Sequence, residues 1–467
     1  MLAPTYAGRG TTLQDQNPND ASEDDVAADP NAIDAMPTKA FFVEMLIRDI
    51  PLERAVLDLV DNCIDGAKRL RDRENRDFSG LRVDITVSAD RFVISDNCGG
   101  FSSHIAKTYA FRFGRDSQAE STKYSIGQFG VGMKRALFKF GRKFTLTSAT
   151  AVERWTVDED VDTWERKKRW TFEFKTRDDG LSVPPEEQGT TIVVERLRPE
   201  VSSKFSSLYF TRSLAEMIRI HQRQFIARGL EIWFNGASLS ATNLELLVGD
   251  VAPAVDMLEH TAPDGSVVRV RLVAGVGASS PTQAGWYVVC NGRVVLAADR
   301  TPTTGWGLDR EHEADVPRYH NQFARFRGVA YFECENAAYL PWNTTKTGVD
   351  ADIGVWRVAL EKMIVLTRAI IDFLNEVDRE LEDQGSDGPL QRALGAASKT
   401  QVETITAPAV FQTPDKTKYS GPRKTRIAYT RPVEQVAALM EAYGVGSAKA
   451  VGERTFDAAY QEEEADK

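Results

Sequence analysis

The residues that could do chemistry are concentrated in short stretches, and the first lies on a predicted helix. Apolar residues recur at helical spacing after Pro51, so one face of this helix should be buried. Four polar residues share the opposite face at i, i+3, i+4 and i+7: Asp58, Asp61, Asn62 and Asp65. Carboxylates at these spacings repel, and a bound Mg²⁺ would offset the repulsion because its ligands are oxygens. A solvated helix face is the alternative interpretation.

Three motifs that contain glycine follow along the chain. In Asp96-Asn97-Cys98-Gly99-Gly100, after a predicted strand, the glycines allow close approach to a flat ligand, and the Asp can accept from the adenine amine. Gly127-Gln128-Phe129-Gly130-Val131-Gly132 precedes a predicted helix, whose free N–H groups favour an anion. Gly189-Thr190 opens a strand, and its hydroxyl can join a buried polar network. Taken singly, each motif also suits an ordinary turn.

Residue periodicity predicts the elements that position these motifs. Strands are expected at 83–87, 92–95, 144–148, 170–175 and 191–195. The polar stretch 101–126 has no strong periodicity, which is typical of a functional or mobile loop. A second mixed region should contain strands at 267–273, 285–290, 293–296 and 328–333 and a long helix at 353–381. Asn291-Gly292 suits a hairpin turn between two of these strands.

Composition is that of a globular protein with several domains. The 467 residues are 42% hydrophobic and 27% charged, which excludes global disorder. Residues 1–38 contain seven acidic residues and one basic residue, so this arm carries more than half of the net charge of −10. No apolar run reaches the ~18 residues of a membrane helix, and no signal peptide is recognisable. The four cysteines have neither zinc nor disulfide spacing, so we expect a reduced, cytoplasmic location without membrane association.

Taken in order, the motifs resemble the GHKL ATPase superfamily. This superfamily includes DNA gyrase B subunits, MutL, MORC proteins, the ninety-kilodalton heat-shock chaperones and sensor histidine kinases. The resemblance covers about residues 40–200 and implies an α/β (α+β) fold in which a Bergerat-fold sandwich binds ATP with Mg²⁺. A sensor kinase needs a phospho-accepting His before the ATPase domain, whereas the first His here is His104, inside the predicted ATP lid 101–126. The resemblance therefore favours the gyrase, MutL, MORC and chaperone branches.

The resemblance implies a role for each motif residue. Asp58 would activate the attacking water, and Asn62 would hold Mg²⁺. Asp96 would bind the adenine amine, with Thr190 beside it. The predicted cofactor-binding set is Asn62, Asp65, Asp96, Gly100, Gly127, Gly130, Val131, Gly132 and Thr190.

A lysine from the following domain completes the predicted site. Lys346, in the polar stretch 340–348, would contact the γ-phosphate and stabilise its charge. Lys134, just after the glycine motif, is the weaker alternative, and an exposed loop lysine is the other interpretation of Lys346.

Two positions depart from the family pattern. Asp58 stands where hydrolysing members have Glu, and its side chain is one methylene shorter. A base must come within hydrogen-bond reach of the water, so slow hydrolysis is an expectation. Cys98 stands where the Asp-x-Gly-x-Gly motif has its first glycine, so we expect the backbone to turn differently there.

The expected organisation has five segments. They are a disordered acidic arm (1–38), a GHKL ATPase domain (39–200), a transducer-like α/β domain (201–384), a flexible basic linker (385–428) and a short helical C-terminal segment (429–467).

The expected function is Mg-dependent ATP binding and hydrolysis by an ATP-gated homodimer clamp, with DNA as a candidate client in DNA management or defence. Basic clusters at 134–143, 166–169 and 416–426 could meet nucleic acid, although a charge run is more often a solvated face. The alternative is a chaperone-like or ATP-sensing module that contacts protein and hydrolyses little.

Overall fold

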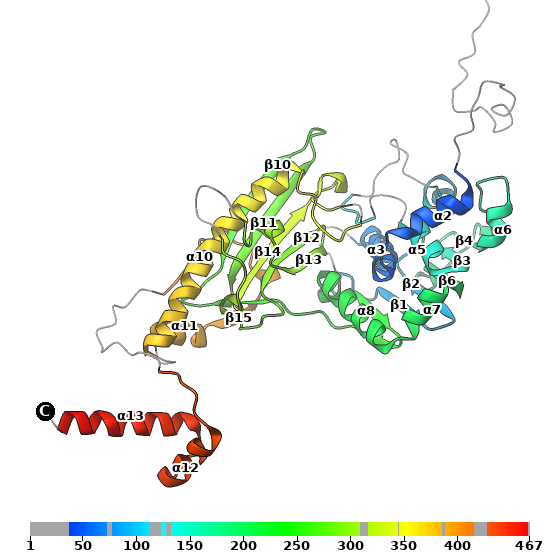
Figure 1. The fold of residues 1–467 in the computed structure, drawn as a ribbon. Coiled ribbons are helices and arrows are strands. Elements are labelled where there is room, and N and C mark those ends of the chain that lie inside the picture. The colour runs from blue at the N-terminus through cyan, green and yellow to red at the C-terminus, as the bar shows by residue number, and fades with distance from the viewer. Residues whose placement is uncertain are drawn as a thin grey trace, which may run out of the picture.

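The described residues form two large β-sheets that lie side by side, each with its own helices (Figure 1), and one small sheet of two strands. The computed structural model describes residues 37–71, 77–112, 123–127, 132–308, 316–343, 345–384, 388–414 and 427–465. The predicted α/β fold class is confirmed. The predicted acidic arm lies outside the described residues, apart from Pro37 and Thr38.

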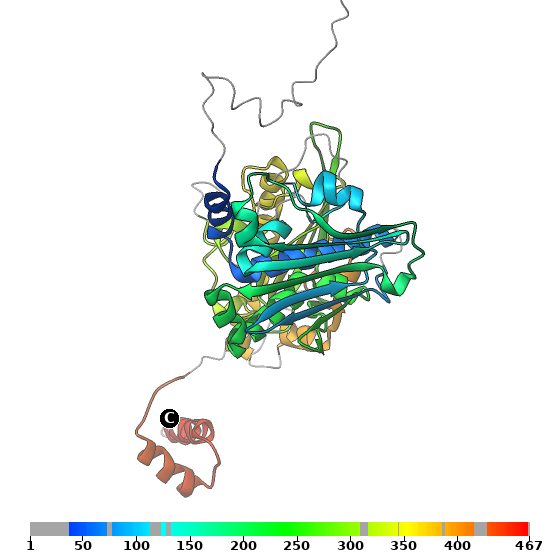
Figure 2. The same ribbon diagram turned by 90° about the vertical axis from the view of Figure 1, so that its right-hand side faces the viewer.

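The first sheet has eight strands in the order β5-β4-β3-β6-β2-β1-β7-β8. Their bounds are β1 Arg82–Val87, β2 Arg91–Asp96, β3 Gly141–Ala149, β4 Glu153–Asp160, β5 Phe174–Asp179, β6 Gly189–Leu197, β7 Glu231–Phe234 and β8 Ala237–Ser238. Neighbouring strands are antiparallel except β1 and β7, which are parallel. The helices are α2 Lys39–Arg48, α3 Leu52–Leu70, α4 Ser103–Ile105, α5 Gly132–Phe140 and α6 Val161–Arg166, with a π-helix, η1, over Ala106–Ala110. Among these, α3 and α5 pack against each other. Figure 2 views the molecule from the side on which this sheet lies.

The first sheet continues beyond the domain boundary that was predicted at residue 200. The chain passes through α7 (Pro199–Ser206), α8 (Leu208–His221) and α9 (Arg223–Ala227) before β7 returns to pair with β1. Parallel strands need such a long crossover, usually through helices. The first structural unit therefore reaches at least Ser238.

The second sheet has five strands in the order β10-β11-β14-β12-β13. Their bounds are β10 Ala254–Thr261, β11 Val267–Val276, β12 Gly285–Cys290, β13 Arg293–Asp299 and β14 Phe326–Glu333. The long helix α10 (Gly354–Gln384) covers one face of this sheet (Figure 1). Asn291 and Gly292 form the predicted turn between β12 and β13, with φ of 48° and 91°. A turn of this kind matches the right-handed twist of a hairpin, and Gly292 adopts its left-handed φ without a Cβ penalty.

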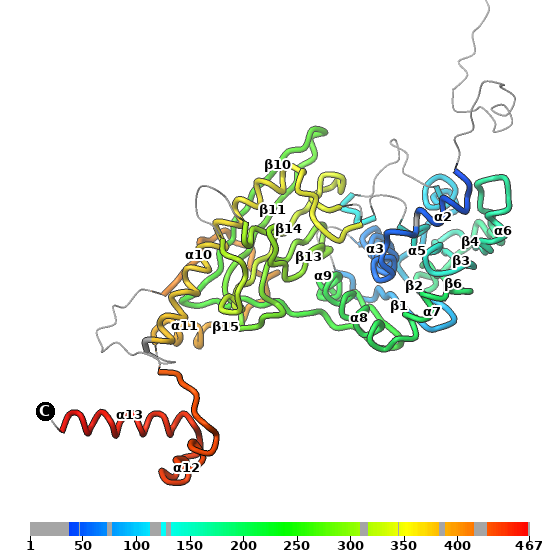
Figure 3. Tube along the Cα trace, viewed as in Figure 1, coloured from blue at the N-terminus to red at the C-terminus, as the bar shows by residue number. Residues whose placement is uncertain are grey.

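The segment predicted as a flexible linker is partly ordered. It contains α11 (Pro389–Ala396) and β15 (Ser398–Gln401), which pairs with β9 (Glu245–Val248). The apolar residues Leu390, Ala393 and Leu394 are buried, which explains why a stretch rich in polar residues still folds. Beyond it, α12 (Val433–Tyr443) and α13 (Ala448–Ala465) form a helical pair set apart from both sheets (Figure 3).

Helix α3 lies at the centre of the first core. Its apolar residues Leu59, Val60 and Ile64 are buried against the sheet, and each contributes roughly 1.5–3 kcal/mol of burial free energy. Among the described residues, no helix is both long and apolar enough to span a membrane. All four cysteines are buried and unpaired.

Candidate functional site

Three of the four residues on the polar face of α3 are shielded from solvent. Asp61 and Asp65 are buried, and the Asp58 side chain is only 13% exposed. The face points toward the glycine motif and the second sheet, so partners must neutralise it. The sequence alternative of a solvated face is therefore wrong for these three residues.

The two described ends of the glycine motif lie directly against this face. A Cβ placed on Gly132 would be 3.1 Å from Asp58 Oδ2, and one placed on Gly127 would be 3.3 Å from Asn62 Oδ1. Side chains at these two positions would crowd the polar face, which is a physical reason for glycine there. Gly130 and Val131, the other predicted members, lie outside the described residues.

Asp65 fixes the start of the glycine motif. Its carboxylate accepts hydrogen bonds from the backbone N–H groups of Ile126 (2.8 Å) and Gly127 (2.7 Å). Hydrogen bonds to a charged carboxylate are stronger than neutral ones. In this arrangement Asp65 positions the loop, and its predicted direct contact with a cofactor stays a prediction.

A second polar group surrounds Asp96 at the end of β2. Asp96 Oδ1 accepts from the backbone N–H groups of Cys98 (2.8 Å) and Thr190 (3.3 Å). Burial raises the pKa of Asp96, and these hydrogen bonds oppose the rise. The Thr190 hydroxyl lies 3.3 Å from Ser148 Oγ, which also accepts from the Phe101 N–H at 2.8 Å. The structure thus brings Asp96 and Thr190 together, as the sequence predicted.

Gly100 packs tightly against the polar group around Asp96. Its φ is +60°, and a Cβ there would overlap the Ala149 carbonyl oxygen and lie 2.8 Å from Ser148 Oγ. Gly99 also has a positive φ, so the motif turns at two successive glycines. Cys98 itself is buried, with its backbone bonded to Asp96, so the departure from the family pattern is accommodated inside the core.

Lys346 reaches helix α3 from the second half of the chain. Its Nζ lies 3.3 Å from Asp58 Oδ1 and 2.9 Å from Asp61 Oδ2. The loop is held by Asn343, whose backbone oxygen accepts from the Lys346 N–H at 2.9 Å. The Lys346 side chain is only 6% exposed, so the alternative of an exposed loop lysine is wrong. Burial alone would lower the pKa of Lys346, but the charges of Asp61 and Asp58 raise it overall.

Asp61 is the fully buried centre of the site. It accepts hydrogen bonds from Lys346 Nζ, from Arg293 Nε (2.9 Å to Oδ2) and from Gln222 Nε2 (2.8 Å). Burial would raise the pKa of Asp61, but the charges of Arg293 and Lys346 lower it to about 2. Sequence reasoning placed Asp61 on the polar face without giving it a role, and it missed Arg293. Arg293 directly follows the Asn-Gly turn, and an arginine at that position gives no sequence signal for burial.

The predicted lid is anchored at both of its described ends. At its start, the Lys134 ammonium donates to the carbonyl oxygens of Ala110 (2.8 Å) and Arg112. Lys134 is buried, and this burial lowers its pKa to about 8. Because these contacts occupy the Lys134 ammonium, Lys134 is less suitable than Lys346 as the phosphate lysine. At the other end, Tyr124 N–H donates to the Glu335 carbonyl oxygen (2.9 Å) in the second half of the chain.

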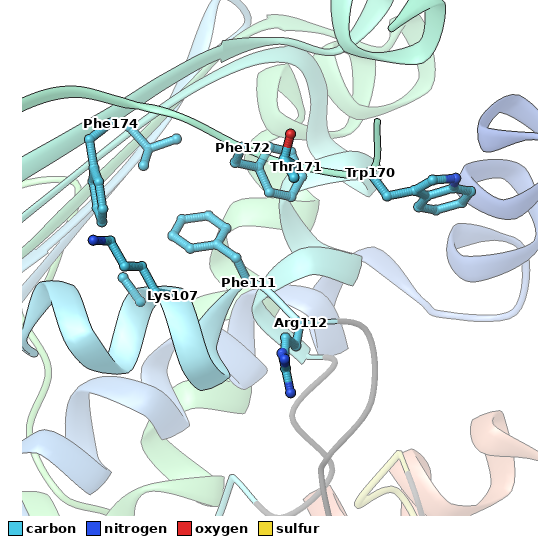
Figure 4. A pocket seen from close by; sticks show the side chains of 9 residues that line it. Lys107, Phe111, Arg112, Trp170, Thr171, Phe172 and Phe174 are labelled. Carbon is cyan, nitrogen blue, oxygen red and sulfur yellow. The ribbon is translucent and has the colours of Figure 1, made fainter. Parts of the chain in front are cut away.

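A cavity of about 410 Å³ lies between the start of the lid and the segment before β5 (Figure 4). Its lining is Ala106, Lys107, Phe111, Arg112, Val157, Trp170, Thr171, Phe172 and Phe174. The Lys107 ammonium lies 5.7 Å from the centroid of the Phe174 ring. The lining contains none of the predicted site residues.

The donor set suits a magnesium ion shared with a phosphate ligand rather than a closed protein cage. Among the described residues, no cluster of three or more His, Cys, Asp or Glu could hold a metal. Asn62 is exposed and its side chain has no hydrogen bond to the described part of the chain, so its amide oxygen is available beside Gly127. Mg²⁺ keeps several waters and commonly combines one or two protein oxygens with substrate phosphates.

Comparison with known families agrees with this geometry. Residues 50–190 match the family model described as histidine kinase-, DNA gyrase B-, and HSP90-like ATPase. The comparison with curated proteins gives no match. The matched segment contains the α3 face, the Asp96 group and the glycine motif, while Lys346 and Arg293 lie outside it. The match therefore supports a GHKL-type ATPase domain over residues 50–190, and with it ATP binding.

Proposed function

We propose that the protein is a Mg-dependent ATPase whose site is completed by the second half of the chain. The observation that carries the proposal is the convergence of the Asp58 carboxylate, the Asn62 amide and the Lys346 ammonium at the glycine motif. Asp96, Gly100 and Thr190 would hold the adenine. The N–H groups at the start of α5, which begins at Gly132, would face the phosphates.

In this proposal the chain's own residues divide the chemistry between them. Asp58 would accept the proton of the attacking water, and Lys346 would stabilise the negative charge that develops on the γ-phosphate. Mg²⁺, held by Asn62 and the phosphates, would neutralise further charge. Because Lys346 now contacts Asp58, an incoming γ-phosphate would compete with Asp58 for the ammonium.

The test is Mg²⁺-dependent ATP turnover by the wild type and by Asp58→Ala, with ATP binding measured on both. Loss of the base should reduce turnover by roughly 10²–10⁴-fold while ATP still binds. Asp256→Ala is the matched control, because Asp256 also pairs with a lysine, Lys362 at 3.3 Å, but does so on the second sheet away from α3. ATP binding without turnover in the wild type would favour an ATP sensor, and no ATP binding would refute the proposal.

We also propose the homodimer clamp, with DNA as its first candidate client. The support for DNA is a basic loop at the end of α6, where Arg166, the last residue of the helix, and Lys168 and Arg169 after it are exposed. Lys39 holds this loop by donating to the carbonyl oxygens of Trp164, Lys167 and Arg169 at 2.6–2.9 Å. The predicted cluster at 134–143 is less suitable, because Lys134 is buried and Arg142 pairs with Glu165. The cluster at 416–426 falls on the undescribed residues 415–426.

A protein client is the second candidate, and a separate observation favours it. The α12–α13 pair exposes the apolar side chains of Val433, Phe456 and Tyr460, each more than half exposed. Stimulation of ATP turnover by duplex DNA would select the first client. Stimulation by an unfolded protein, without DNA binding, would select the second.

A further inference from the structure

The turn between β12 and β13 is buried, although most hairpin turns lie on the surface. Asn291 is 6% exposed and Arg293 is 1% exposed. The turn is inserted between helix α3, the end of the predicted lid and the Lys346 loop. A buried turn needs partners for all its polar groups, and several of its partners here belong to the candidate site or to the predicted lid.

Arg293 connects the acid and the lysine of the site. Its Nε donates to both oxygens of Asp61, at 3.0 and 2.9 Å, and its Nη1 donates to the Lys346 carbonyl oxygen at 3.4 Å. Lys346 has a φ of +51°, an uncommon conformation for a residue with a side chain. Arg293 therefore holds the backbone of the Lys346 loop and, through Asp61, one of the two carboxylates that receive its ammonium.

Asn291 connects the same turn to the lid. Its Nδ2 donates to the Ser125 carbonyl oxygen (3.4 Å), and its Oδ1 accepts from the Cys334 N–H (3.0 Å). Lys68, on α3, donates to the backbone carbonyl oxygens of both Asn291 and Tyr124 at 3.0 Å. One turn of the second sheet thus contacts both the helix that carries the candidate base and the last residues of the lid.

We propose that the β12–β13 turn is a positioning element that makes ATP hydrolysis in the first unit depend on the second, with Arg293 as its main positioning residue. This inference rests on the proposed ATPase function. The turn touches Asp61, the Lys346 loop and the lid end, but the contacts of Asp96, Gly100 and Thr190 come from the first sheet and its connections. Loss of the turn should therefore reduce turnover while ATP binding persists.

The sharpest test is Arg293→Lys, which keeps the positive charge but cannot reproduce the contacts of the planar guanidinium. We expect ATP affinity within about threefold of wild type and kcat lowered by at least tenfold, since misplacing a catalytic group by about 1 Å can cost roughly 10²-fold. If Arg293 served stability alone, Arg293→Lys would have a lower melting temperature but no loss of kcat that exceeds its loss of ATP affinity.

Arg327→Lys is the matched control. Arg327 is also an arginine of the second sheet and also 1% exposed, but its hydrogen bonds go to the backbone carbonyl oxygens of Ala324, Phe326, Ala278 and Ser280. We expect its kcat to stay within about twofold of wild type, because none of these partners belongs to the site. Asn291→Ala, which removes no charge, is the second test variant and should also lower kcat more than affinity if Arg293→Lys does not fold.

Three results would overturn the inference. They are a wild-type kcat in a folded Arg293→Lys or Asn291→Ala protein, an equal loss of kcat in Arg327→Lys, and a loss of affinity as large as the loss of kcat. Failure of the proposed function is seen separately, because it appears in the wild type as absent ATP binding or absent turnover.

Discussion

At the scale of single residues, the candidate site contains positions where no side chain fits. Gly100 and Gly180 both have left-handed backbones, with φ of +60° and +73°. A Cβ on Gly100 would overlap the Ala149 carbonyl oxygen, whereas one on Gly180 would have no atom within 4 Å. A comparison of Gly100 with Gly180 therefore separates two free-energy costs of adding a side chain, that of the left-handed backbone and that of the steric overlap.

We therefore expect different results from two alanine substitutions. Gly180→Ala should lower the free energy of unfolding by about 1 kcal/mol, the cost of a left-handed conformation for alanine. Gly100→Ala should lower it by roughly 3 kcal/mol or more, because the backbone around Ala149 must move, and ATP binding should be lost. Chemical denaturation and nucleotide titration of both variants measure these effects. Similar losses in both would show that the space around Gly100 is not the limiting factor.

At the scale of elements, helix α8 joins α3 to the second sheet through a buried histidine. His221 Nδ1 bonds to the Val294 carbonyl oxygen, and its Nε2 lies 3.2 Å from Arg54 Nη1. If Nδ1 carries the proton, Nε2 accepts from Arg54, so the neutral ring satisfies both contacts. Burial, followed by the charges of Arg293 and Arg54, lowers the pKa of His221 to about 3, while Asp61 acts in the opposite direction.

This pKa predicts that acid weakens the contact between α3, α8 and β13. The unfolded chain binds a proton at His221 near pH 6.5 and the folded chain does not, so stability is complete above pH 6.5 and falls as the pH decreases toward 3. At pH 5 the loss should be about 2 kcal/mol. The measurement is the free energy of unfolding at pH 7 and at pH 5 for the wild type and His221→Gln, which can keep both hydrogen bonds.

The control for this prediction is His104→Gln, because His104 is exposed at the start of the lid. That variant should keep the wild-type dependence on pH, while His221→Gln should lose most of it. Asp61 does not interfere with this measurement. Its pKa of about 2 in the folded protein and its ordinary pKa of 3.8 both lie below the pH range used. An unchanged pH dependence in His221→Gln would contradict the assignment.

Many of the helices and strands of the two cores could be predicted from residue patterns, but α7, α8, β4, β7 and β10 were not predicted. Helix α3 and strands β1, β2, β12 and β14 follow their apolar periodicity. Strand β4 was missed because only two of its three buried positions, Trp155 and Val157, are apolar, while the third is Glu159 in an acidic stretch. The strand predicted at 170–175 begins only at Phe174, since Trp170 and Phe172 contribute their rings to aromatic packing instead.

The parts of the site that lie in short motifs could be predicted from the sequence, and Lys346 could be proposed from the family resemblance. Asp96, Gly100 and Thr190 follow from short motifs, as do Asn62 and the glycine motif. Arg293 could not be assigned, because its partner Asp61 is 232 positions away in the chain. An arginine at the start of a strand has no sequence signal for burial, and only the packing of two sheets brings it to α3.

At the scale of the whole molecule, the first unit depends on residues that follow the predicted boundary at 200. Strand β7 pairs with β1 through four residue pairs, and without it β1 becomes an exposed edge. Helix α8 buries Leu214 and Ile218 in the same core. Gln222, which directly follows α8, donates to Asp61. The part of the chain that can fold alone should therefore end after β8, not after β6.

Two truncated proteins test this division. Residues 37–243 keep the complete first sheet and should unfold cooperatively and bind ATP, because the Asp96 group and the glycine motif are intact. They should not hydrolyse ATP at the wild-type rate, since Arg293 and Lys346 are missing. Residues 37–200 lose β7 and α8 and should aggregate or show no cooperative unfolding, because the apolar contacts of β1 and α3 are exposed. Calorimetry and nucleotide titration distinguish the two proteins. A stable, ATP-binding 37–200 fragment would place the boundary where the motifs alone predict it, and wild-type hydrolysis by 37–243 would show that the second sheet serves another purpose than completing the site.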